Sequence, residues 1–287
     1  MDITSYLKNM QASVETALQN GLPDESVRPA ILHEAMRYAV LNGGKRIRPI
    51  LCLAAAEVFG QAPDAAMAPA IAVELYHCST LVHDDLPCMD DDALRRGRPT
   101  CHIKYGAANA VLTGDALMIQ AFQILAETGT PQLVLELAQA AGSQGVIAGQ
   151  VEDLAAEGQT PSADLIEFIH LHKTAVLIQA SVRMGAIVGG ANPAEFEQLS
   201  VFGQKIGLAF QIEDDILDET STDEVLGKPA GSDLEQDKMT YPAVHGLAAA
   251  QAKVSELTGE AIVALDTLSH DTQPLRAIAG YLVSRTF

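Results

Sequence analysis

The sequence predicts an all-α protein, a single domain over residues 1–287 built as a bundle of mostly antiparallel helices. Apolar residues recur at helical spacing along almost the whole chain, and no alternating strand pattern of useful length occurs. The turns between the apolar segments are short, which favours antiparallel neighbours. With 287 residues, 48% of them hydrophobic, the chain can bury a large core, and we expect one domain rather than two.

Glycine, proline and asparagine mark the ends of the predicted helices in the first half of the chain. Apolar residues from Ile3 to Leu18 lie at helical spacing before Gly21, and Asn42 with the two glycines after it ends the second helix. The predicted helices cover residues 3–20, 30–41, 50–59, 65–86, 107–126 and 132–156.

The second half of the chain continues the helical pattern. A turn has Thr160 as the cap and Pro161 as the first residue of a helix that carries the run H-L-H-K-T-A-V-L-I-Q. We expect a long helix over residues 193–218 and three shorter helices after residue 240. The residues expected to separate these last helices are Gly246, Gly259 and Pro274.

Charge and composition limit the classes of partner. The formal net charge of −19 argues against nucleic acid and against an anionic membrane surface. An anionic substrate remains compatible with it, because local basic residues and metal ions set the potential inside a pocket. The cysteines have no spacing typical of zinc or of a disulfide framework, and no basic stretch followed by an apolar one begins the chain. No apolar run is expected to span a bilayer, so the sequence predicts a reduced, cytoplasmic protein.

An acidic run follows an apolar helix in the stretch from Glu74 to Pro99, which reads E-L-Y-H-C-S-T-L-V-H-D-D-L-P-C-M-D-D-D-A-L-R-R-G-R-P. The apolar spacing predicts a core-facing helix that Asp84 and Asp85 continue. Carboxylates packed this closely require either a cation or full solvation. Oxygen ligands without histidine or cysteine at coordinating spacing favour Mg²⁺, whose octahedron substrate phosphates complete. A solvated acidic loop is the alternative from this segment alone.

A second acidic run and several basic residues complete the pattern. In F-Q-I-E-D-D-I-L-D, Asp214 and Asp218 are four residues apart and share one helix face. Two aspartate clusters on apolar helices are hard to explain as solvated surface residues. If the helices face each other across a cavity, the two clusters can hold several Mg²⁺ ions around one diphosphate. The arginines after the first acidic run can bind a polyanion through bidentate hydrogen bonds. The basic cluster after Gly44 fits a helix terminus and a phosphate clamp equally well.

Two further patterns are ambiguous from the residues alone. Gln150 and Asp153 lie three apart on one helix face, as expected for a structural hydrogen-bonding pair and equally for pocket residues. His170 and His172 face different ways on a helix, which disfavours a zinc pair. Lys173 lies in an otherwise apolar helix, where a lysine can simply extend its charged end into water.

The chain resembles the short-chain trans-prenyl diphosphate synthases, the family that includes farnesyl and geranylgeranyl diphosphate synthases. The resemblance runs from A-M-R-Y-A-V-L-N-G-G-K-R-I-R-P to Y-L-V-S-R and includes, in order, H-D-D-L-P-C-M-D-D-D-A-L-R-R-G-R-P-T, G-D-A-L, H-K-T, F-Q-I-E-D-D-I-L-D and T-Y-P. It implies an isoprenoid synthase type of bundle around a central cavity, and a homodimer. It also implies Mg²⁺-dependent head-to-tail condensation of isopentenyl diphosphate with allylic diphosphates, with release of diphosphate.

The resemblance assigns roles to the residues at matching positions. The matches to the two aspartate-rich motifs, which would bind a cluster of about three Mg²⁺ ions with the allylic diphosphate, are Asp84, Asp85, Asp90, Asp214 and Asp218. The matches to groups that bind the same diphosphate are Arg95, Lys173 and Lys228. The matches to the metal-free site for isopentenyl diphosphate are Lys45, Arg48, His77 and Arg96, so the cluster after Gly44 becomes a predicted phosphate clamp.

The implied chemistry is ionisation of the allylic diphosphate in a dry pocket, where Mg²⁺ and lysines stabilise the departing group. The double bond of isopentenyl diphosphate attacks the cation, and the proton then lost goes, in the family, to the released diphosphate. Thr174 and Gln211 match residues whose oxygens face the cation. With Lys173 and Lys228 they form the predicted catalytic set, and no protein nucleophile is required.

Product length depends on the helix before Asp84. Each helical turn of about 5.4 Å matches roughly one isoprene unit, and bacterial farnesyl enzymes typically have an aromatic residue five positions before the first aspartate. Here that position is Ser79, followed by Thr80. This departure favours geranylgeranyl over farnesyl diphosphate, with Tyr76 as a candidate floor; closure of the pocket by another helix, for example through Met118, is the alternative.

Two other classes of function are compatible with the fold. A terpene cyclase usually lines its pocket with aromatic rings, whereas this chain has no Trp and 5% aromatics. A non-catalytic subunit of a heteromeric prenyl synthase lacks intact aspartate motifs, and both motifs are intact here. The synthase is therefore the preferred prediction.

Overall fold

The computed structural model describes residues 1–160, 162–220 and 239–284, and the chain divides into two compact units. The amino-terminal unit comprises Asp2–Ile50 and Met67–Val134. The carboxyl-terminal unit comprises Leu51–Ala66 and Leu135–Phe287, together with Met1. Both are helical, which confirms the predicted all-α class; a single domain over residues 1–287 stays a prediction.

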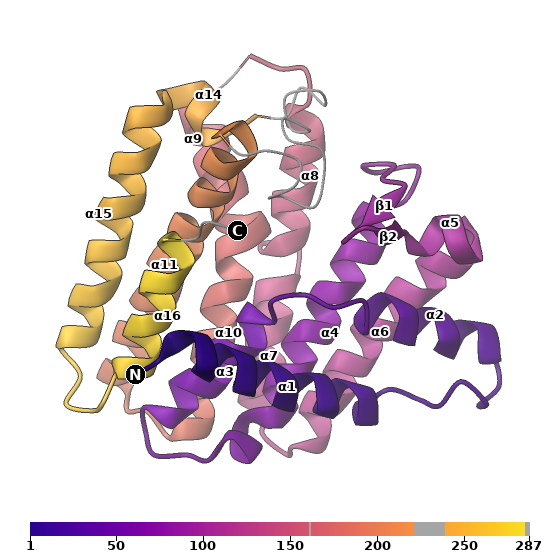
Figure 1. Cartoon of the computed structure of the whole chain (residues 1–287), viewed down its shortest axis with the longest axis horizontal. Helices are drawn as coiled ribbons and strands as arrows, with labels where there is room; N and C mark the ends of the chain where they lie inside the picture. Colours follow the sequence, from indigo (N-terminus) through magenta and orange to yellow (C-terminus); the bar gives the residue numbers. More distant parts are fainter. Residues whose placement is uncertain (161, 221–238, 285–287) are drawn as a thin grey trace. The chain divides into compact units, whose positions relative to one another are not determined.

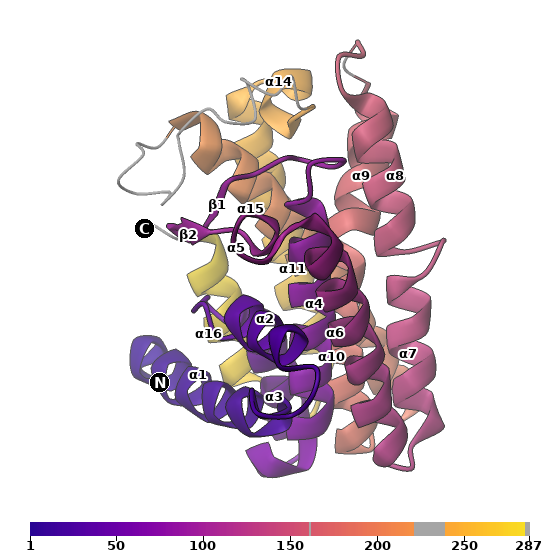
Figure 2. The same cartoon turned by 90° about the vertical axis from the view of Figure 1, so that its right-hand side faces the viewer.

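The amino-terminal unit is built around α4. Its elements are α1 (Ile3–Gly21), α2 (Ala30–Val40), the start of α3 (Ile47–Glu57), α4 (Met67–Asp84), β1 (Leu94–Arg95), β2 (Arg98–Pro99), α5 (Cys101–Tyr105) and α6 (Ala107–Glu127). Helix α4 packs along α6, which also contacts α2 and α5 (Figure 2). Along α4 most side chains are buried, including Leu75 and the fully buried Tyr76. The first acidic cluster therefore follows the core helix of this unit.

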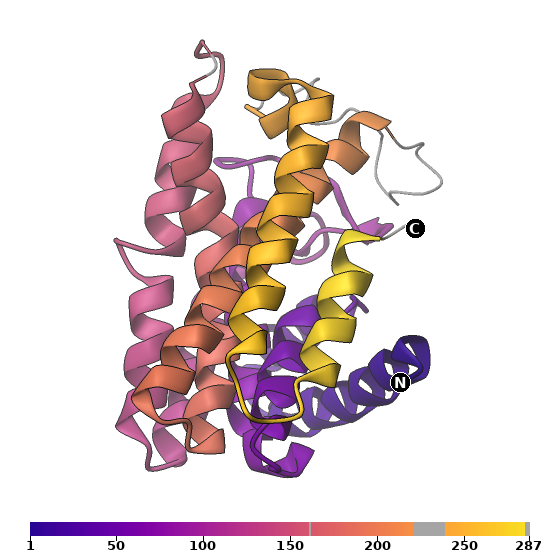
Figure 3. The same cartoon turned by 90° about the vertical axis from the view of Figure 1, so that its left-hand side faces the viewer.

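The carboxyl-terminal unit is built around α11. Its elements are the rest of α3, η1 (Pro63–Ala66), α7 (Pro131–Ala141), α8 (Val146–Ala156), α9 (Ala163–Ile169), the π-helix η2 (His170–Ala175), α10 (Val176–Gly189), α11 (Pro193–Thr220), α14 (Tyr241–His245), α15 (Leu247–Asp266) and α16 (Gln273–Val283). Helix α11 contacts α10, η2 and α15 (Figure 1). Helices α15 and α16, in gold and yellow, lie side by side in Figure 3.

Several predicted boundaries are confirmed. Helix α1 ends at Gly21, α2 stops before Asn42, and α6 matches its predicted range within one residue. The three helices predicted after residue 240 are present, with Gly246 between the first two.

The helix predicted over residues 132–156 is wrong, because α7 and α8 are separate helices. The chain turns so tightly between them that a Cβ on Gly145 would lie 2.0 Å from the carbonyl oxygen of Ala140. Glycine alone fits such a close approach of backbone to backbone. The sequence signal was the pair of glycines in A-G-S-Q-G, which a continuous apolar pattern on both sides concealed.

Four smaller expectations also fail. The residue that precedes α9 as its cap is Ser162 rather than Thr160, and Pro161 lies outside the described residues. Gly259 lies inside α15. Helix α4 ends at Asp84, so Asp85 follows the helix rather than continuing it. Strands β1 and β2 pair antiparallel as a two-residue hairpin, a small exception to the absence of strands.

One helical segment, Pro63–Asp84, is long and apolar enough to cross a membrane by length and composition, which corrects the expectation that no run reaches that length. Within its most apolar window 67% is buried inside the protein. Burial of this degree is typical of a core helix, since a helix that is apolar all round is covered by other elements.

Candidate functional site

The first acidic cluster forms where the chain leaves α4 and folds back onto its end. The Asp85 N–H donates to the Leu81 carbonyl at 3.1 Å, which closes the last turn of α4. The Asp90 N–H then donates to the carbonyl of Asp84 at 2.9 Å. This hydrogen bond closes the loop and brings Asp84, Asp85 and Asp90 together, as the sequence predicted.

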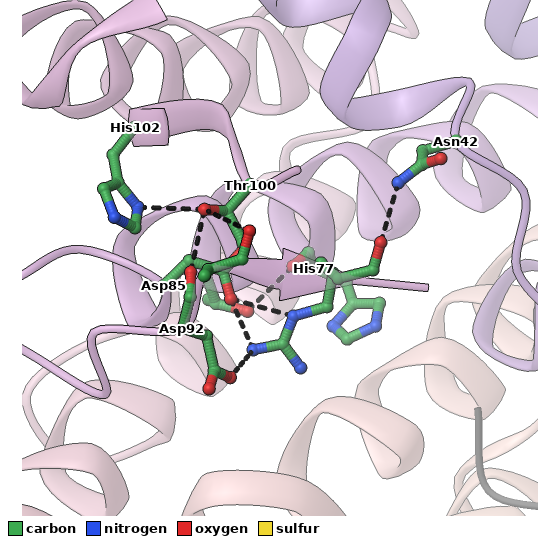
Figure 4. A network of polar contacts seen from close by, with 9 residues as sticks. Asn42, His77, Asp85, Asp92, Thr100 and His102 are labelled. Carbon is green, nitrogen blue, oxygen red and sulfur yellow. Dashed lines mark hydrogen bonds and ion pairs between the residues drawn. The ribbon is translucent and has the colours of Figure 1, made fainter. Parts of the chain in front are cut away.

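Within this cluster Asp85 differs from its neighbours because it is 3% exposed and bonded to an arginine. Its Oδ1 accepts hydrogen bonds from Arg95 Nε at 2.8 Å and from Arg95 Nη2. Arg95 Nη2 also reaches Asp92 Oδ2 at 3.0 Å (Figure 4). Burial raises the pKa of Asp85, and the adjacent Arg95 opposes that rise. Arg95, a predicted diphosphate ligand, therefore bridges two carboxylates of the acidic loop.

The β1–β2 hairpin holds Arg95 in place. Thr100 Oγ1 donates to the Asp92 carbonyl at 2.8 Å and lies 3.1 Å from His102 Nδ1 (Figure 4). Asn42 Nδ2 donates to the Arg95 carbonyl at 3.2 Å. A small cavity lies beside the hairpin, and its lining includes Asp85, Arg95, Arg96 and Asn42. The sequence analysis assigned no site role to Asn42, Thr100 or His102. The contact of Asn42 with Arg95 spans 53 residues, a separation that leaves no local pattern.

The predicted clamp for isopentenyl diphosphate comes together in the amino-terminal unit. Arg48 Nη1 lies 3.3 Å from His77 Nε2, and an Arg96 guanidinium nitrogen donates to the Gly43 carbonyl. Burial, and next the nearby Arg48, holds the pKa of His77 well below its ordinary value. His77 is therefore neutral near pH 7, and its Nε2 can accept from Arg48. Lys45 is exposed on the same loop.

Ser79 and Thr80 lie on α4, where both hydroxyls bond to the helix backbone. Ser79 is fully buried, and its Oγ donates to the Tyr76 carbonyl at 2.6 Å. Thr80 Oγ1 donates to the His77 carbonyl at 2.8 Å. Tyr76 is fully buried one turn earlier. The small side chains of Ser79 and Thr80 therefore lie between the acidic cluster and Tyr76, the candidate floor of the product pocket.

The second acidic cluster lies on α11 in the carboxyl-terminal unit. Asp214 is partly exposed, whereas Asp215 and Asp218 are buried. Asp215 accepts from the Tyr241 N–H at 2.7 Å and from Gln211 Nε2 at 2.9 Å, and His170 Nε2 lies 3.1 Å from it. The sequence analysis gave Asp215 no role; its place beside Asp214 was the only signal.

The π-helix η2 presents two predicted catalytic residues to their partners. Thr174 Oγ1 donates to Gln211 Oε1 at 2.7 Å, while the amide of Gln211 donates to Asp215. Lys173 Nζ pairs with Asp153 of α8. Asp153, for which the sequence left a structural role and a pocket role open, therefore contacts a predicted catalytic residue. π-Helical turns occur frequently at functional sites.

Two glycines let η2 approach its neighbours this closely. A Cβ on Gly149 of α8 would lie 2.2 Å from the Lys173 backbone nitrogen. A Cβ on Gly207 of α11 would lie 2.8 Å from the Ala175 Cα. Any larger residue at either position would push η2 away from α8 or α11.

The donor set fits Mg²⁺ bound together with a substrate. Within residues 1–160, 162–220 and 239–284, no three histidine, cysteine or carboxylate side chains converge into a closed metal site. Mg²⁺ commonly takes only one or two carboxylates and completes its octahedron with substrate phosphates and water. Asp84, Asp90 and Asp214 supply oxygens of this kind, and Arg95 lies close enough to Asp84 to interact with its charge. Lys228, a predicted catalytic residue, lies outside the described residues.

Comparison with known proteins gives one family. The family model described as polyprenyl synthetase matches residues 29–270. The geranylgeranyl pyrophosphate synthase of Capsicum annuum is 47% identical over 292 residues, which is 98% of this chain and 78% of that protein. The heterodimeric geranylgeranyl pyrophosphate synthase large subunit 1 of Arabidopsis thaliana is 46% identical over 297 residues, 99% of this chain and 80% of that protein. Both plant proteins are described as chloroplastic.

A solved structure of high similarity also belongs to a prenyl-transferring enzyme. The geranyltransferase of Helicobacter pylori, complexed with magnesium and isoprenyl diphosphate, has a TM-score of 0.84 at 35% identity. The similarity covers 99% of this chain and 97% of that one.

Proposed function

The chain belongs to the polyprenyl synthetase family, and we propose that it condenses isopentenyl diphosphate with allylic diphosphates to give a short-chain all-trans prenyl diphosphate. It is a prenyltransferase, as its relatives are. The observation that best supports the substrate class is that each unit pairs a carboxylate cluster with basic side chains. In the amino-terminal unit, Arg95 pairs with Asp85 and Asp92, and in the carboxyl-terminal unit, Lys173 pairs with Asp153.

Bound Mg²⁺ would neutralise the allylic diphosphate and make it a better leaving group. The residues that would hold it are Asp84, Asp85, Asp90, Asp214 and Asp218. Arg95 and Lys173 are placed by their carboxylate partners and would accept the charge that grows on the leaving diphosphate. Because both are already paired, substrate binding exchanges one anionic partner for another.

The allylic cation would be stabilised by neutral oxygens rather than by a protein nucleophile. Thr174 donates to Gln211 Oε1, and Asp215 fixes the other end of that amide. The lone pairs of both oxygens can then face a positive charge at a fixed angle. Lys45, Arg48, His77 and Arg96 would hold the diphosphate of isopentenyl diphosphate while its double bond attacks.

Geranylgeranyl diphosphate is the favoured product over farnesyl diphosphate. Ser79 is a small residue at the position where the farnesyl pattern has an aromatic one, and the plant relatives are described as geranylgeranyl pyrophosphate synthases. The test is product analysis by mass spectrometry with Mg²⁺, dimethylallyl diphosphate and excess isopentenyl diphosphate, for the wild type and Ser79→Phe. A twenty-carbon product that shortens to fifteen carbons in the variant supports the proposal. A wild type that already stops at fifteen carbons contradicts it.

We expect a homodimer, and α6 offers apolar surface for one. Val111, Leu112 and Ile119 are 41%, 56% and 66% exposed on this helix. One relative is described as the large subunit of a heterodimer, so a heteromeric partner is the competing arrangement. Light scattering on the isolated chain separates a dimer from a monomer that awaits a partner.

Cell location is decided by fractionation. A cytoplasmic location is the proposal, and plastid localisation, as in the relatives described as chloroplastic, is the outcome that would overturn it.

A further inference from the structure

Arg46 lies inside the predicted phosphate clamp, yet its side chain faces the protein interior. It is 2% exposed, while Lys45 before it is exposed and Arg48 after it is partly exposed. Its backbone has a φ of 53°, in the left-handed region that residues other than glycine rarely adopt. This backbone turn points the Arg46 side chain away from the direction taken by Lys45.

The guanidinium of Arg46 makes a contact with each of three elements of the amino-terminal unit. Nη1 pairs with Glu74 Oε1 of α4 at 2.7 Å, and Nε pairs with Glu15 Oε1 of α1 at 2.7 Å. Nη2 donates to the Val40 carbonyl at the end of α2 at 2.6 Å. Glu74 is 2% exposed, so the pair with it is fully buried. A buried charge pair is not needed for stability, since apolar residues of similar volume often serve as well.

The same loop is held on either side of Arg46 by other contacts. Gln11 Nε2 donates to the Gly44 carbonyl at 2.8 Å, before it, and Arg48 meets His77 at 3.3 Å, after it. Glu74 and His77 are three residues apart on α4 and therefore face the loop from the same side of the helix. Helix α4 thus fixes both Arg46 and Arg48 against one rigid surface.

We propose that the Arg46–Glu74 pair is a positioning device for isopentenyl diphosphate, because it fixes the backbone between Lys45 and Arg48, two of the residues that would hold the diphosphate. Arg46 itself does not touch the substrate. The inference rests on the proposed function, which assigns the clamp of Lys45 and Arg48 to this substrate.

The first test is Glu74→Gln, which keeps the shape of the side chain and removes its charge. Isothermal calorimetry with isopentenyl diphosphate, without an allylic substrate, measures binding in the absence of turnover. We expect affinity to fall about tenfold, because the residues that hold the diphosphate remain but are no longer held in place by the buried pair. In turnover assays the KM for isopentenyl diphosphate should rise by the same factor, with the kcat and the KM for the allylic substrate within about twofold of wild type.

The double variant Arg46→Met with Glu74→Leu separates positioning from stability. It removes both charges of the buried pair, and the other partner of Arg46, Glu15, is 31% exposed and can be solvated. The midpoint of thermal unfolding should therefore recover relative to Glu74→Gln. The weakened binding of isopentenyl diphosphate should persist. If binding recovers together with stability, the pair is structural only and the inference is wrong.

The matched control is Glu136→Gln in the carboxyl-terminal unit. Glu136 is 8% exposed and pairs with Arg183 Nε at 2.8 Å, so the change also breaks a largely buried ion pair. It should lower stability without altering either KM. An unchanged affinity of Glu74→Gln, or the same loss of affinity in the control, overturns the inference. A wild type that binds isopentenyl diphosphate but makes no product contradicts the proposed function instead.

Discussion

The two acidic clusters are built in different ways. The amino-terminal cluster lies on a loop after α4, and the loops around it contain Arg46, Asp91 and Arg96, whose φ angles are 53°, 51° and 52°. The carboxyl-terminal cluster lies within α11 and faces η2, and both of these are helical throughout. Left-handed backbone costs a residue other than glycine about 1–3 kcal/mol and persists only where surrounding contacts enforce it.

This difference shows which interactions hold the side chains of each cluster in place. In the amino-terminal unit charged pairs such as Arg95 with Asp85 fix the loops. In the carboxyl-terminal unit close helix packing at Gly149 and Gly207 sets the geometry, and hydrogen bonds to Asp215 complete it. Substitutions of charge and substitutions of volume should therefore have different effects in the two units.

The largest expected effect is a loss of turnover, and it is shared by the two clusters because each contains predicted Mg²⁺ ligands. Asp84→Ala and Asp214→Ala should each lower kcat by about a thousandfold, since each removes a predicted Mg²⁺ ligand whose effect is several kcal/mol. Steady-state kinetics measures the loss, and circular dichroism checks that the fold is intact. Asp164→Ala, an exposed helical aspartate, is the control and should behave as wild type. Near-normal turnover in either cluster variant would remove that residue from the metal site.

The next largest effect is specific to the carboxyl-terminal unit. Gly149→Ala and Gly207→Ala should lower the free energy of unfolding by about 2–3 kcal/mol, because the added methyl group meets backbone atoms. Gly259→Ala is the matched control, since a Cβ there meets nothing within 4 Å. It should raise stability by about 0.5–1 kcal/mol, as expected for alanine replacing glycine within a helix. Urea unfolding gives all three values. An unchanged free energy of unfolding for Gly149→Ala would show that the packing between α8 and η2 can relax.

A smaller effect distinguishes the second aspartate of each pair. Asp215→Asn should lower the free energy of unfolding by about 1–2 kcal/mol, because one of its buried donors loses an acceptor. Asp85→Asn should cost less, since Arg95 is 31% exposed and keeps Asp92 as a partner. Chemical denaturation of the two variants side by side tests this order. The reverse order would mean that the loop, not the helix, is the more tightly held cluster.

The smallest effect is a pH dependence in the amino-terminal unit. The pKa of His77 is lowered in the folded protein, so the unfolded chain binds more protons as pH falls below about 6.5. The stability that depends on neutral His77 is therefore present above that pH and is lost below it, by at most about 1.4 kcal/mol per pH unit. His77→Gln should flatten this part of the stability curve. Identical curves for the variant and the wild type would contradict the assignment.

Much of the candidate site was predictable because its signals are local. The spacing of Asp84, Asp85 and Asp90 and the helical repeat around Asp214 can be read from a few neighbouring residues. The roles of Asp215 and Asp153 were not predictable in this way. Their partners, Tyr241 and Lys173, are 26 and 20 residues away, and the contacts depend on how helices pack. The break between α7 and α8 was missed for a different reason, because the continuous apolar pattern on both sides concealed the local signal of Gly142 and Gly145.

The sequence by itself determined the all-α class, most helix ends and where both acidic runs lie along the chain, because helical periodicity, capping and charge spacing act over a few residues. The tertiary structure alone decided which aspartate binds an arginine, which glycine admits η2, and that Arg46 turns inward to Glu74 rather than outward beside Lys45. These outcomes depend on contacts between segments far apart in the chain, and burial sets the strength of each contact.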